Sequence, residues 1–361
     1  MKKFLATISF SIILFTSSAA MAREPATPEF TVQEAVEEAL AHSANIKSDK
    51  YDVDRTYEIR QFASQNLEFV PEGPASSDVT RPYYALLQAD TNWQMSEKSL
   101  ELQIDKVEME ARKAYNAVLQ GIEKEKASEA ALRNAERQRT VAYAKLRVGI
   151  INKQDMLQAE ASVTAAKAAY EENVKNLNDS YQKFNYLVGL YPEDRPVLTE
   201  LPTFEKIKVD SLDYYIEKSL ADNPSLWLAE KNVEIAKTSL KTYDFTSSTR
   251  TEPYKAKELE VNQAVTSAAD GKEQARKALR SIYYSLTGLE EQYEPAVEQV
   301  KLDEENLRII KVKYDVGMAT IMDVTQAETD LAQAKQQLMD LICEHDSLKQ
   351  TFTKPWADSA G

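Results

Sequence analysis

The sequence is poor in the residues that build most metal and redox sites. It contains one cysteine and two histidines among 361 residues. Cys343 cannot form an internal disulfide, which leaves either a link between two copies of the chain or a half-buried thiol on a helix. His345 follows two residues later, and this spacing places the two side chains on different helix faces. Since His42 is remote in sequence, we predict no metal site and no cofactor.

Catalytic motifs are also missing. The sequence has no glycine-rich phosphate loop and no motif that surrounds a catalytic nucleophile. Adjacent acidic residues such as Glu171 and Glu172 are typical of a solvated helix face rather than of a catalytic carboxylate pair. We therefore predict that the protein is not an enzyme.

Positive charge is the minority sign, because 58 acidic residues oppose 44 basic ones and the net charge is −14. Residues 1–22 hold two lysines and no acid, so their removal would lower the net charge to −16. An acidic chain of this kind is repelled by nucleic acids and by anionic membrane surfaces. We therefore predict no nucleic-acid partner.

Glycine and proline are scarce, with 8 and 12 residues respectively. No proline occurs between Pro82 and Pro192, and only Pro295 interrupts the stretch from Pro253 to Pro355. Proline-free stretches of this length, rich in Ala, Glu, Lys and Leu, indicate helices well beyond the usual globular length. The sequence therefore predicts an all-α fold.

The first 22 residues have the pattern of a secretory signal peptide. Lys2 and Lys3 form a charged start, residues 4–15 are mostly apolar, and Ala20-Met21-Ala22 matches a cleavage site. The apolar run is shorter than the ~20 residues of a membrane-spanning helix. We therefore expect an exported protein.

Two short segments, 168 residues apart, resemble each other. Residues 145–149 read Lys-Leu-Arg-Val-Gly, and residues 313–317 read Lys-Tyr-Asp-Val-Gly. In each, the glycine suits the left-handed position that ends a helix, and Asn152 or Thr320 can cap the helix that follows. Each segment thus predicts the turn of a helical hairpin, here called tip 1 (146–155) and tip 2 (314–323).

Further matches extend this similarity into a tandem repeat. Residues 111–114 match 275–278 at an offset of 164, and Leu40-Ala41 matches Leu220-Ala221 at an offset of 180. The predicted organisation follows from these anchors. It comprises a signal peptide (1–22), repeat 1 (23–190), a linker (191–210), repeat 2 (211–354) and a tail (355–361).

Apolar residues mark the helices inside each repeat. Thr31 caps a helix predicted to run to about Asn66, and Ser211 caps its counterpart, which is interrupted at Asn223-Pro224. Helix resumes near Pro82 in repeat 1 and near Pro253 in repeat 2, with a kink expected at Pro295. The long helices carry coiled-coil seams in steps of three and four residues, such as Leu100, Ile104, Val107, Ala111, Ala114 and Val118. Short tips joining such helices predict antiparallel coiled-coil hairpins.

The tips carry a resemblance to a known family. Each has Val-Gly, a six-residue approach to an aspartate, and then Gln-Ala at the start of a long helix. Residues 114–119 add a segment similar to an A-Y-x-x-L motif. Together with the duplication and the export signal, these motifs resemble the TolC family of outer-membrane efflux proteins over nearly the whole mature chain.

This resemblance implies a homotrimer whose six hairpins close into a hollow helical barrel across the periplasm. The tips would lie at the inner-membrane end, where they would meet a periplasmic adaptor (a membrane fusion protein) and an inner-membrane pump. The implied docking residues are Val148, Gly149, Val316 and Gly317. The implied location is the cell envelope, either periplasmic or associated with the outer membrane.

The family also closes its entrance with polar contacts between tips. By position, Asp155 and Tyr314 match one such pair, and Asp323 matches a carboxylate that lines the constriction. Gln326 replaces a second carboxylate and Ala319 replaces an arginine, so half of the gate is missing. Asp155 and Asp323 have a compatible local explanation, because the helix macrodipole favours an acid in the first turn.

The larger departure concerns the strand hairpins that the family inserts into the membrane. A spanning strand needs ~9–11 residues. The candidate segments, residues 67–81 and 243–252, are too short or interrupted by proline, and residues 83–93 show no apolar–polar alternation. We therefore expect a helical barrel if the chain is trimeric, with little or no β-barrel.

Two functions remain open. The first is an exit-duct component of an export or efflux system that docks an adaptor through its tips. The second is a non-conducting coiled-coil scaffold or adaptor of the cell envelope.

Overall fold

The computed structural model describes residues 23–67, 77–243 and 252–358. The predicted signal peptide therefore lies outside the described residues. The elements are β1 (Glu29–Phe30), α1 (Val32–His42), α2 (Ala44–Gln65), α3 (Ser77–Arg147), α4 (Lys153–Val188), β2 (Val197–Leu198), α5 (Leu212–Ala221), α6 (Pro224–Lys241), α7 (Tyr254–Asp315) and α8 (Ile321–Thr353). Helices thus form most of the described chain, which confirms the predicted all-α class.

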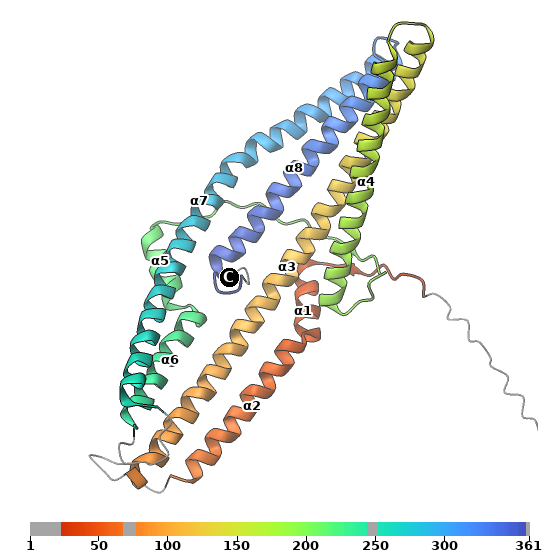
Figure 1. Ribbon diagram of the computed structural model, residues 1–361. Helices are drawn as coiled ribbons and strands as arrows, with labels where there is room; N and C mark the ends of the chain where they lie inside the picture. The colour runs from red at the N-terminus through yellow and green to blue at the C-terminus, as the bar shows by residue number, and fades with distance from the viewer. Residues whose placement is uncertain (1–22, 68–76, 244–251, 359–361) are drawn as a thin grey trace, which may run out of the picture.

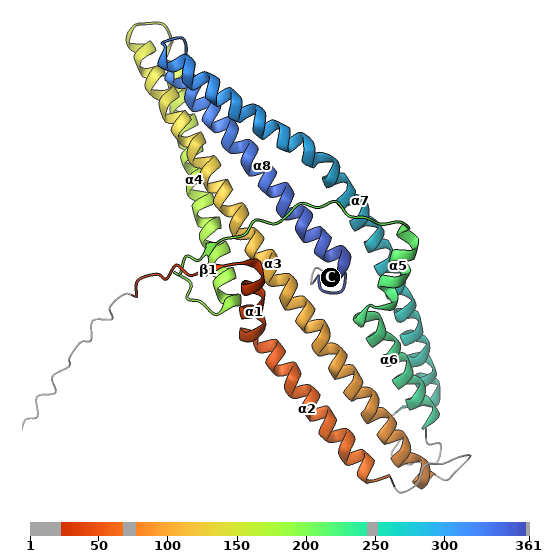
Figure 2. The same cartoon turned by 180° about the vertical axis from the view of Figure 1, so that it is seen from behind.

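Two helical hairpins determine the shape of the molecule. Hairpin 1 consists of α3 and α4, and hairpin 2 of α7 and α8; both turns lie at the same end (Figure 1). In the half nearer the tips, α3 packs along α8 in the middle and α4 and α7 form the two outer edges, as the view from behind also shows (Figure 2). α2 lies along the far half of α3, and α6 along the far half of α7. With 71 residues, α3 is roughly 105 Å long.

The first helix is shorter than predicted. Instead of continuing to Asn66, the chain breaks at Ser43, whose side chain accepts a hydrogen bond from the Ile46 amide at 3.3 Å. The expected interruption in the second half is present, where Asn223 caps α6. Ser43 and Asn223 are 180 residues apart, the same offset as the Leu-Ala anchors. The break at Ser43 carries no proline, which is why only the one at Asn223 was evident.

Other boundaries also differ from those predicted. α3 begins at Ser77, five residues before Pro82. The kink expected at Pro295 does not end α7, which continues through this residue as one helix and bends along its length (Figure 1). Residues 83–93 lie within α3. Most of the two segments expected to have lost their strands lies outside the described residues, at 68–76 and 244–251.

The linker between the halves pairs with residues 29–30, a contact that the sequence did not predict. β1 and β2 pair in parallel, with Phe30 opposite Leu198. The fully buried Tyr115 on α3 lies beside this pair, and its hydroxyl is 3.2 Å from the Phe30 carbonyl and 3.0 Å from the Glu200 carbonyl. The same hydroxyl accepts a hydrogen bond from the Glu200 amide at 3.1 Å. Tyr115 belongs to the A-Y-x-x-L-like segment, so this motif has a structural role here.

Asp194 stabilises the same contact between the linker and the residues that precede α1. Its carboxylate accepts hydrogen bonds from the Ala26 amide at 2.7 Å and the Tyr191 amide at 3.1 Å, and Arg23 lies 3.5 Å away. The Ala26 amide is the main reason why the pKa of Asp194 is lower than its usual value. Residues 23–30 are therefore anchored at the base of hairpin 1.

Apolar clusters stabilise the molecule, and the one around Phe184 also includes Cys343 of α8 from the second half. In the first half, Phe184 of α4 packs edge-on against Phe30 and Tyr115, with ring centroids 5.8 and 6.1 Å apart. In the second half, Leu279 of α7 packs with residues of α5 and α8, including Phe352. The cores thus lie away from the tips, whose side chains are largely exposed.

His345 and Cys343 are both packed into the fold. The Nε2 atom of His345 lies 3.4 Å from Glu290 Oε1, which also accepts the Ile207 amide at 2.7 Å. Phe204 of the linker stacks on Tyr293 at 3.6 Å and contacts the His345 ring. Burial raises the pKa of the Cys343 thiol to about 12. This thiol is 1% exposed, which favours the buried-thiol interpretation over a link between chains.

Gly189, which ends α4, provides a stability test. Its φ is +75°, and a Cβ at this position would overlap the ring of His42, held at the end of α1 by a 2.9 Å contact between its Nδ1 and the Glu38 carbonyl. Gly149 has a φ of +77° but no neighbouring atom within 4 Å. We expect Gly149→Ala to cost about 1–2 kcal/mol from backbone strain alone. Gly189→Ala should cost more, because the ring must also move.

Chemical denaturation followed by circular dichroism measures both losses. The same substitution at the same φ makes Gly149→Ala the matched control. Equal losses for the two variants would show that the His42 contact contributes nothing.

Candidate functional site

Both tips have the same backbone geometry, set by their glycines. Gly149 and Gly317 have φ values of +77° and +78°, which a residue with a Cβ rarely adopts. In tip 1, the amides of Ile150 and Gly149 donate to the carbonyls of Lys145 and Leu146 at 2.9 and 3.0 Å. The amides of Met318 and Gly317 make the equivalent bonds in tip 2. This is the Schellman arrangement, so each helix ends because of a local sequence signal.

Apolar side chains are exposed at both tips. Val148 is 69% exposed and Val316 is 65% exposed, and the residues after each glycine, Ile150 and Met318, are exposed as well. The structure therefore places the predicted docking residues at the outer end of the molecule, on two turns that lie next to each other (Figure 1). Unpartnered apolar side chains grouped in this way are typical of an interaction surface.

Asp155 and Asp323 occupy the first turns of α4 and α8, where each completes a capping box. Asp155 accepts a hydrogen bond from the Asn152 amide at 3.2 Å and its own amide donates to the Asn152 side chain at 3.0 Å. Asp323 makes the same exchange with Thr320. The Thr320 amide is the main reason why the pKa of Asp323 is lower than usual. The local role predicted for both aspartates is therefore present in the structure.

The other two gate candidates behave differently. Tyr314 is partly exposed at the end of α7, and in the described part of the chain it makes no hydrogen bond to Asp155. Gln326 reaches across to hairpin 1, where its Oε1 accepts a hydrogen bond from the Asn134 side chain at 2.8 Å. Its Nε2 donates to Asp330 at 2.8 Å. Gln326 thus joins the two hairpins rather than the two turns.

A polar bridge around Asn134 was not predicted from the sequence. Asn134 is buried on α3, and its Oδ1 accepts a hydrogen bond from Thr325 at 3.1 Å. One turn further along α8, Thr329 donates to the Ala130 carbonyl at 3.2 Å. The sequence signal that could have indicated this bridge is a polar residue on an otherwise apolar helix seam, because such residues often fix helix register. The bridge holds α3 and α8 together about three helical turns from tip 1.

Outer edges of the hairpins carry exposed apolar residues. On α7 these include Leu302 at 63%, Ile309 at 40% and Val312 at 54%, and on α4 they include Leu157 at 61% and Tyr186 at 83%. Leu302 lies 168 positions after Asn134 and is therefore its counterpart in repeat 2. Asn134 is buried in the polar bridge, whereas Leu302 is apolar and exposed. The edges of α4 and α7 are thus unpartnered in the single chain.

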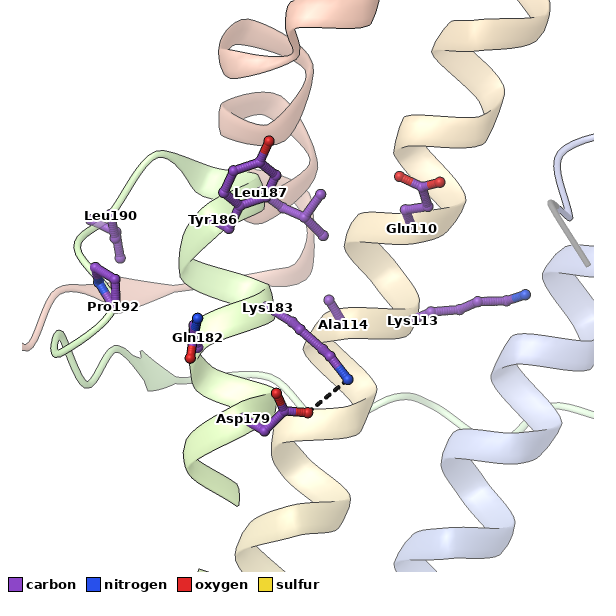
Figure 3. A pocket seen from close by; sticks show the side chains of 10 residues that line it. All are labelled: Glu110, Lys113, Ala114, Asp179, Gln182, Lys183, Tyr186, Leu187, Leu190 and Pro192. Atoms are coloured by element: carbon purple, nitrogen blue, oxygen red, sulfur yellow. Dashed lines mark ion pairs between the residues drawn. The ribbon is translucent and has the colours of Figure 1, made fainter. Parts of the chain in front are cut away.

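A groove of about 650 Å³ lies near the base of hairpin 1, between α3 and α4. Figure 3 shows Ala114 on α3 facing the end of α4, with Leu190 and Pro192 on the segment that follows. The Lys183–Asp179 ion pair, at 2.7 Å, lies at one side. The groove is mainly apolar and open to the surface.

Two negative findings concern the described part of the chain. Within residues 23–67, 77–243 and 252–358, no three histidine, cysteine, aspartate or glutamate side chains are grouped so that they could hold a metal ion. No described helix combines the length and the apolar character that crossing a bilayer requires.

Comparison with known proteins shows similarity in structure alone. No family model matches the sequence. No curated protein matches it either. Among solved structures, the chain is similar to the Campylobacter jejuni outer-membrane channel CmeC, with a TM-score of 0.68, 12% identity, and coverage of 98% of this chain and 94% of that one.

Two further structures show the same similarity. For the Vibrio cholerae outer-membrane protein VceC, the TM-score is 0.63 at 15% identity, covering 90% of this chain and 95% of that one. For CusC, described as a transmembrane channel, the TM-score is 0.63 at 13% identity, covering 94% and 95%. The chain therefore has the fold of these TolC-like channels, which confirms at the level of the fold the resemblance noted from the tips.

Proposed function

We propose that this chain is the subunit of a TolC-like exit duct in a cell-envelope export or efflux system. In this proposal the chain is exported, three copies form the duct, and the tips dock a periplasmic adaptor connected to an inner-membrane pump. The fold shared with outer-membrane channels supports the general class. The assembly and its partners are inferred from the features of this chain.

The open edges of the hairpins carry the proposal. Within the chain, α3 packs along α8, but the equivalent pair in the repeat, α7 and α4, lies on opposite edges (Figures 1 and 2). If α7 of one copy packs along α4 of the next, this contact between copies repeats the α3–α8 contact within the chain, and each hairpin then has another hairpin on both sides. A head-to-tail contact of this kind closes into a ring when the rotation allows it. The exposed Leu302 and Val312 on α7 and Leu157 on α4 fit such a contact.

The groove between α3 and α4 extends this contact surface. It lies on the α4 edge, next to the exposed Tyr186 (Figure 3). A second copy of the chain is the occupant that the ring requires there.

The entrance role of Asp155, Tyr314, Asp323 and Gln326 remains part of this proposal. Both aspartates lie within two turns of the tip glycines, at the end where the adaptor would dock. Gln326 supports the entrance indirectly, because its bond to Asn134 fixes the spacing of the two hairpins.

The test is the oligomeric state of residues 23–361 without detergent. Light scattering coupled to size exclusion should give a trimer, and small-angle X-ray scattering should give the profile of a hollow particle. Leu302→Glu combined with Val312→Glu should yield a monomer with unchanged helicity, because two charges would be buried against an apolar edge. Leu201→Glu, at an exposed position of the linker, is the control.

A monomer at high concentration would contradict the duct and favour the alternative, a non-conducting envelope scaffold. A trimer with a filled interior would also favour the scaffold. A trimer that the α7 variant leaves intact would show that the edges are not the interface.

A further inference from the structure

The two tips differ strongly in charge. Between Arg133 and Asp155, hairpin 1 carries six basic and two acidic residues, a net charge of +4. The equivalent segment of hairpin 2, residues 301–323, carries four basic and five acidic residues, a net charge of −1. The whole chain is at −14, so the positive charge near tip 1 is a local exception.

Most of the basic side chains in residues 133–155 form no ion pair within the described part of the chain. Arg133 lies 3.6 Å from Glu129. Five others form no ion pair with any residue that the structure describes: Arg137, Arg139, Lys145, Arg147 and Lys153. All five are exposed. Their charges are therefore available to a partner.

In residues 301–323 of hairpin 2, most basic side chains form ion pairs with acidic side chains of the same hairpin. Lys301 pairs with Glu298 at 2.8 Å, Arg308 with Glu305 at 2.6 Å, and Lys311 with Glu328 at 3.1 Å. Three of the four bases in residues 301–323 are thus paired within the chain. The contrast depends on residue type, because Glu305 and Asp315 occupy the positions of Arg137 and Arg147 in the repeat.

A groove beside the unpaired arginines can receive side chains. It lies between α3 and α8, has a volume of about 510 Å³, and is lined by Arg137 and Arg139. Ile321 and Val324 of α8 give it an apolar part. Its acids are Glu328, already paired with Lys311, and Glu136.

We propose that the basic end of hairpin 1, residues 133–153, binds an acidic segment of the docking partner in the α3–α8 groove, whereas hairpin 2 contributes apolar contacts. This inference rests on the proposed docking function and specifies the partner's chemistry at one of the two tips. Guanidinium groups bind carboxylates through paired, planar hydrogen bonds. Three arginines line the groove, and two of them, Arg137 and Arg139, form no ion pair within the described residues. A concave site with an apolar part fits a protein segment, since a flat lipid surface cannot enter between two helices.

The test uses the mature chain and a defined probe. The probe is a capped helical peptide with glutamate at every third or fourth position, and the same peptide with glutamine is its neutral counterpart. Fluorescence anisotropy should show binding of the glutamate peptide only. Binding should weaken as salt is added, because about 1 M salt shortens the screening length to about 3 Å.

Charge-reversed variants locate the binding. Arg137→Glu with Arg147→Asp introduces the residues that hairpin 2 already tolerates at the equivalent positions, and should weaken binding by about tenfold or more. Lys301→Glu with Lys313→Glu in hairpin 2 is the matched control and should leave binding within about twofold. Circular dichroism of all variants checks that the helices are intact.

Three results would overturn the inference. They are no binding of the glutamate peptide, equal losses from the two pairs of variants, and binding to phosphatidylglycerol vesicles in place of the peptide. A hollow trimer that fails to bind the peptide would remove this inference and leave the duct. A monomer that binds the peptide through Arg137 and Arg147 would contradict the proposed duct but support binding of an acidic partner.

Discussion

Replacing Phe184 by alanine should destabilise the folded chain by about 3–5 kcal/mol. Its side chain is fully buried at the base of hairpin 1, edge-on to Phe30 and Tyr115. Removal of the ring loses its transfer free energy and leaves a cavity between α4, α3 and the N-terminal strand, where rigid helices can close the space only in part. The loss should appear in urea denaturation as a lower midpoint with an unchanged slope.

Glu172→Ala is the matched control for this variant. Glu172 lies on the exposed face of the same helix, so its replacement should change stability by less than about 0.5 kcal/mol. Phe184 is far from the tips along α4, so the folded Phe184→Ala protein should still bind a partner at tip 1. A loss below about 1 kcal/mol would mean that the aromatic cluster is not a stabilising core.

Replacing Leu279 by alanine should cost about 2–5 kcal/mol. Leu279 is fully buried on α7, in the cluster that joins α7 to α5 and to Phe352 of α8. Phe352 in turn stacks on Tyr215 at 4.4 Å, so the cavity would open beside a rigid aromatic pair. Leu259→Ala, at an exposed position of the same helix, is the control and should have little effect.

The two core variants together test whether the halves of the chain unfold as one unit. α3 and α8 are joined by the Asn134 bridge and, at the other end of α8, by Lys354, which lies 2.8 Å from both Asp105 and Glu108. If this packing couples the halves, each variant should shift a single transition. Two transitions, with Phe184→Ala affecting only one, would show that the hairpins unfold independently.

Local structure could be predicted because its causes lie within a few residues. The tip glycines need a positive φ, and Asn152 and Thr320 cap the next helix with aspartates three residues away. The interruption at Asn223 could be predicted because a proline follows it. The interruption at Ser43 has no proline and depends on a serine N-cap alone. That break could be found only by extending the repeat offset to Ser43.

The sequence by itself determined most of the helices, the tips with their N-cap residues, and the fold class, because glycine, caps and apolar periodicity act over one or two helical turns. Only the tertiary structure decided which distant groups meet. The Asn134–Gln326 bridge joins residues 192 apart, and Tyr115 meets Glu200 across 85 residues. Such pairs depend on the register and crossing of long helices, in which a shift of one turn moves every contact by about 5.4 Å. For the same reason, the sequence shows that residues 133–155 carry six bases, but only the packed structure shows that five of them form no ion pair within the described residues.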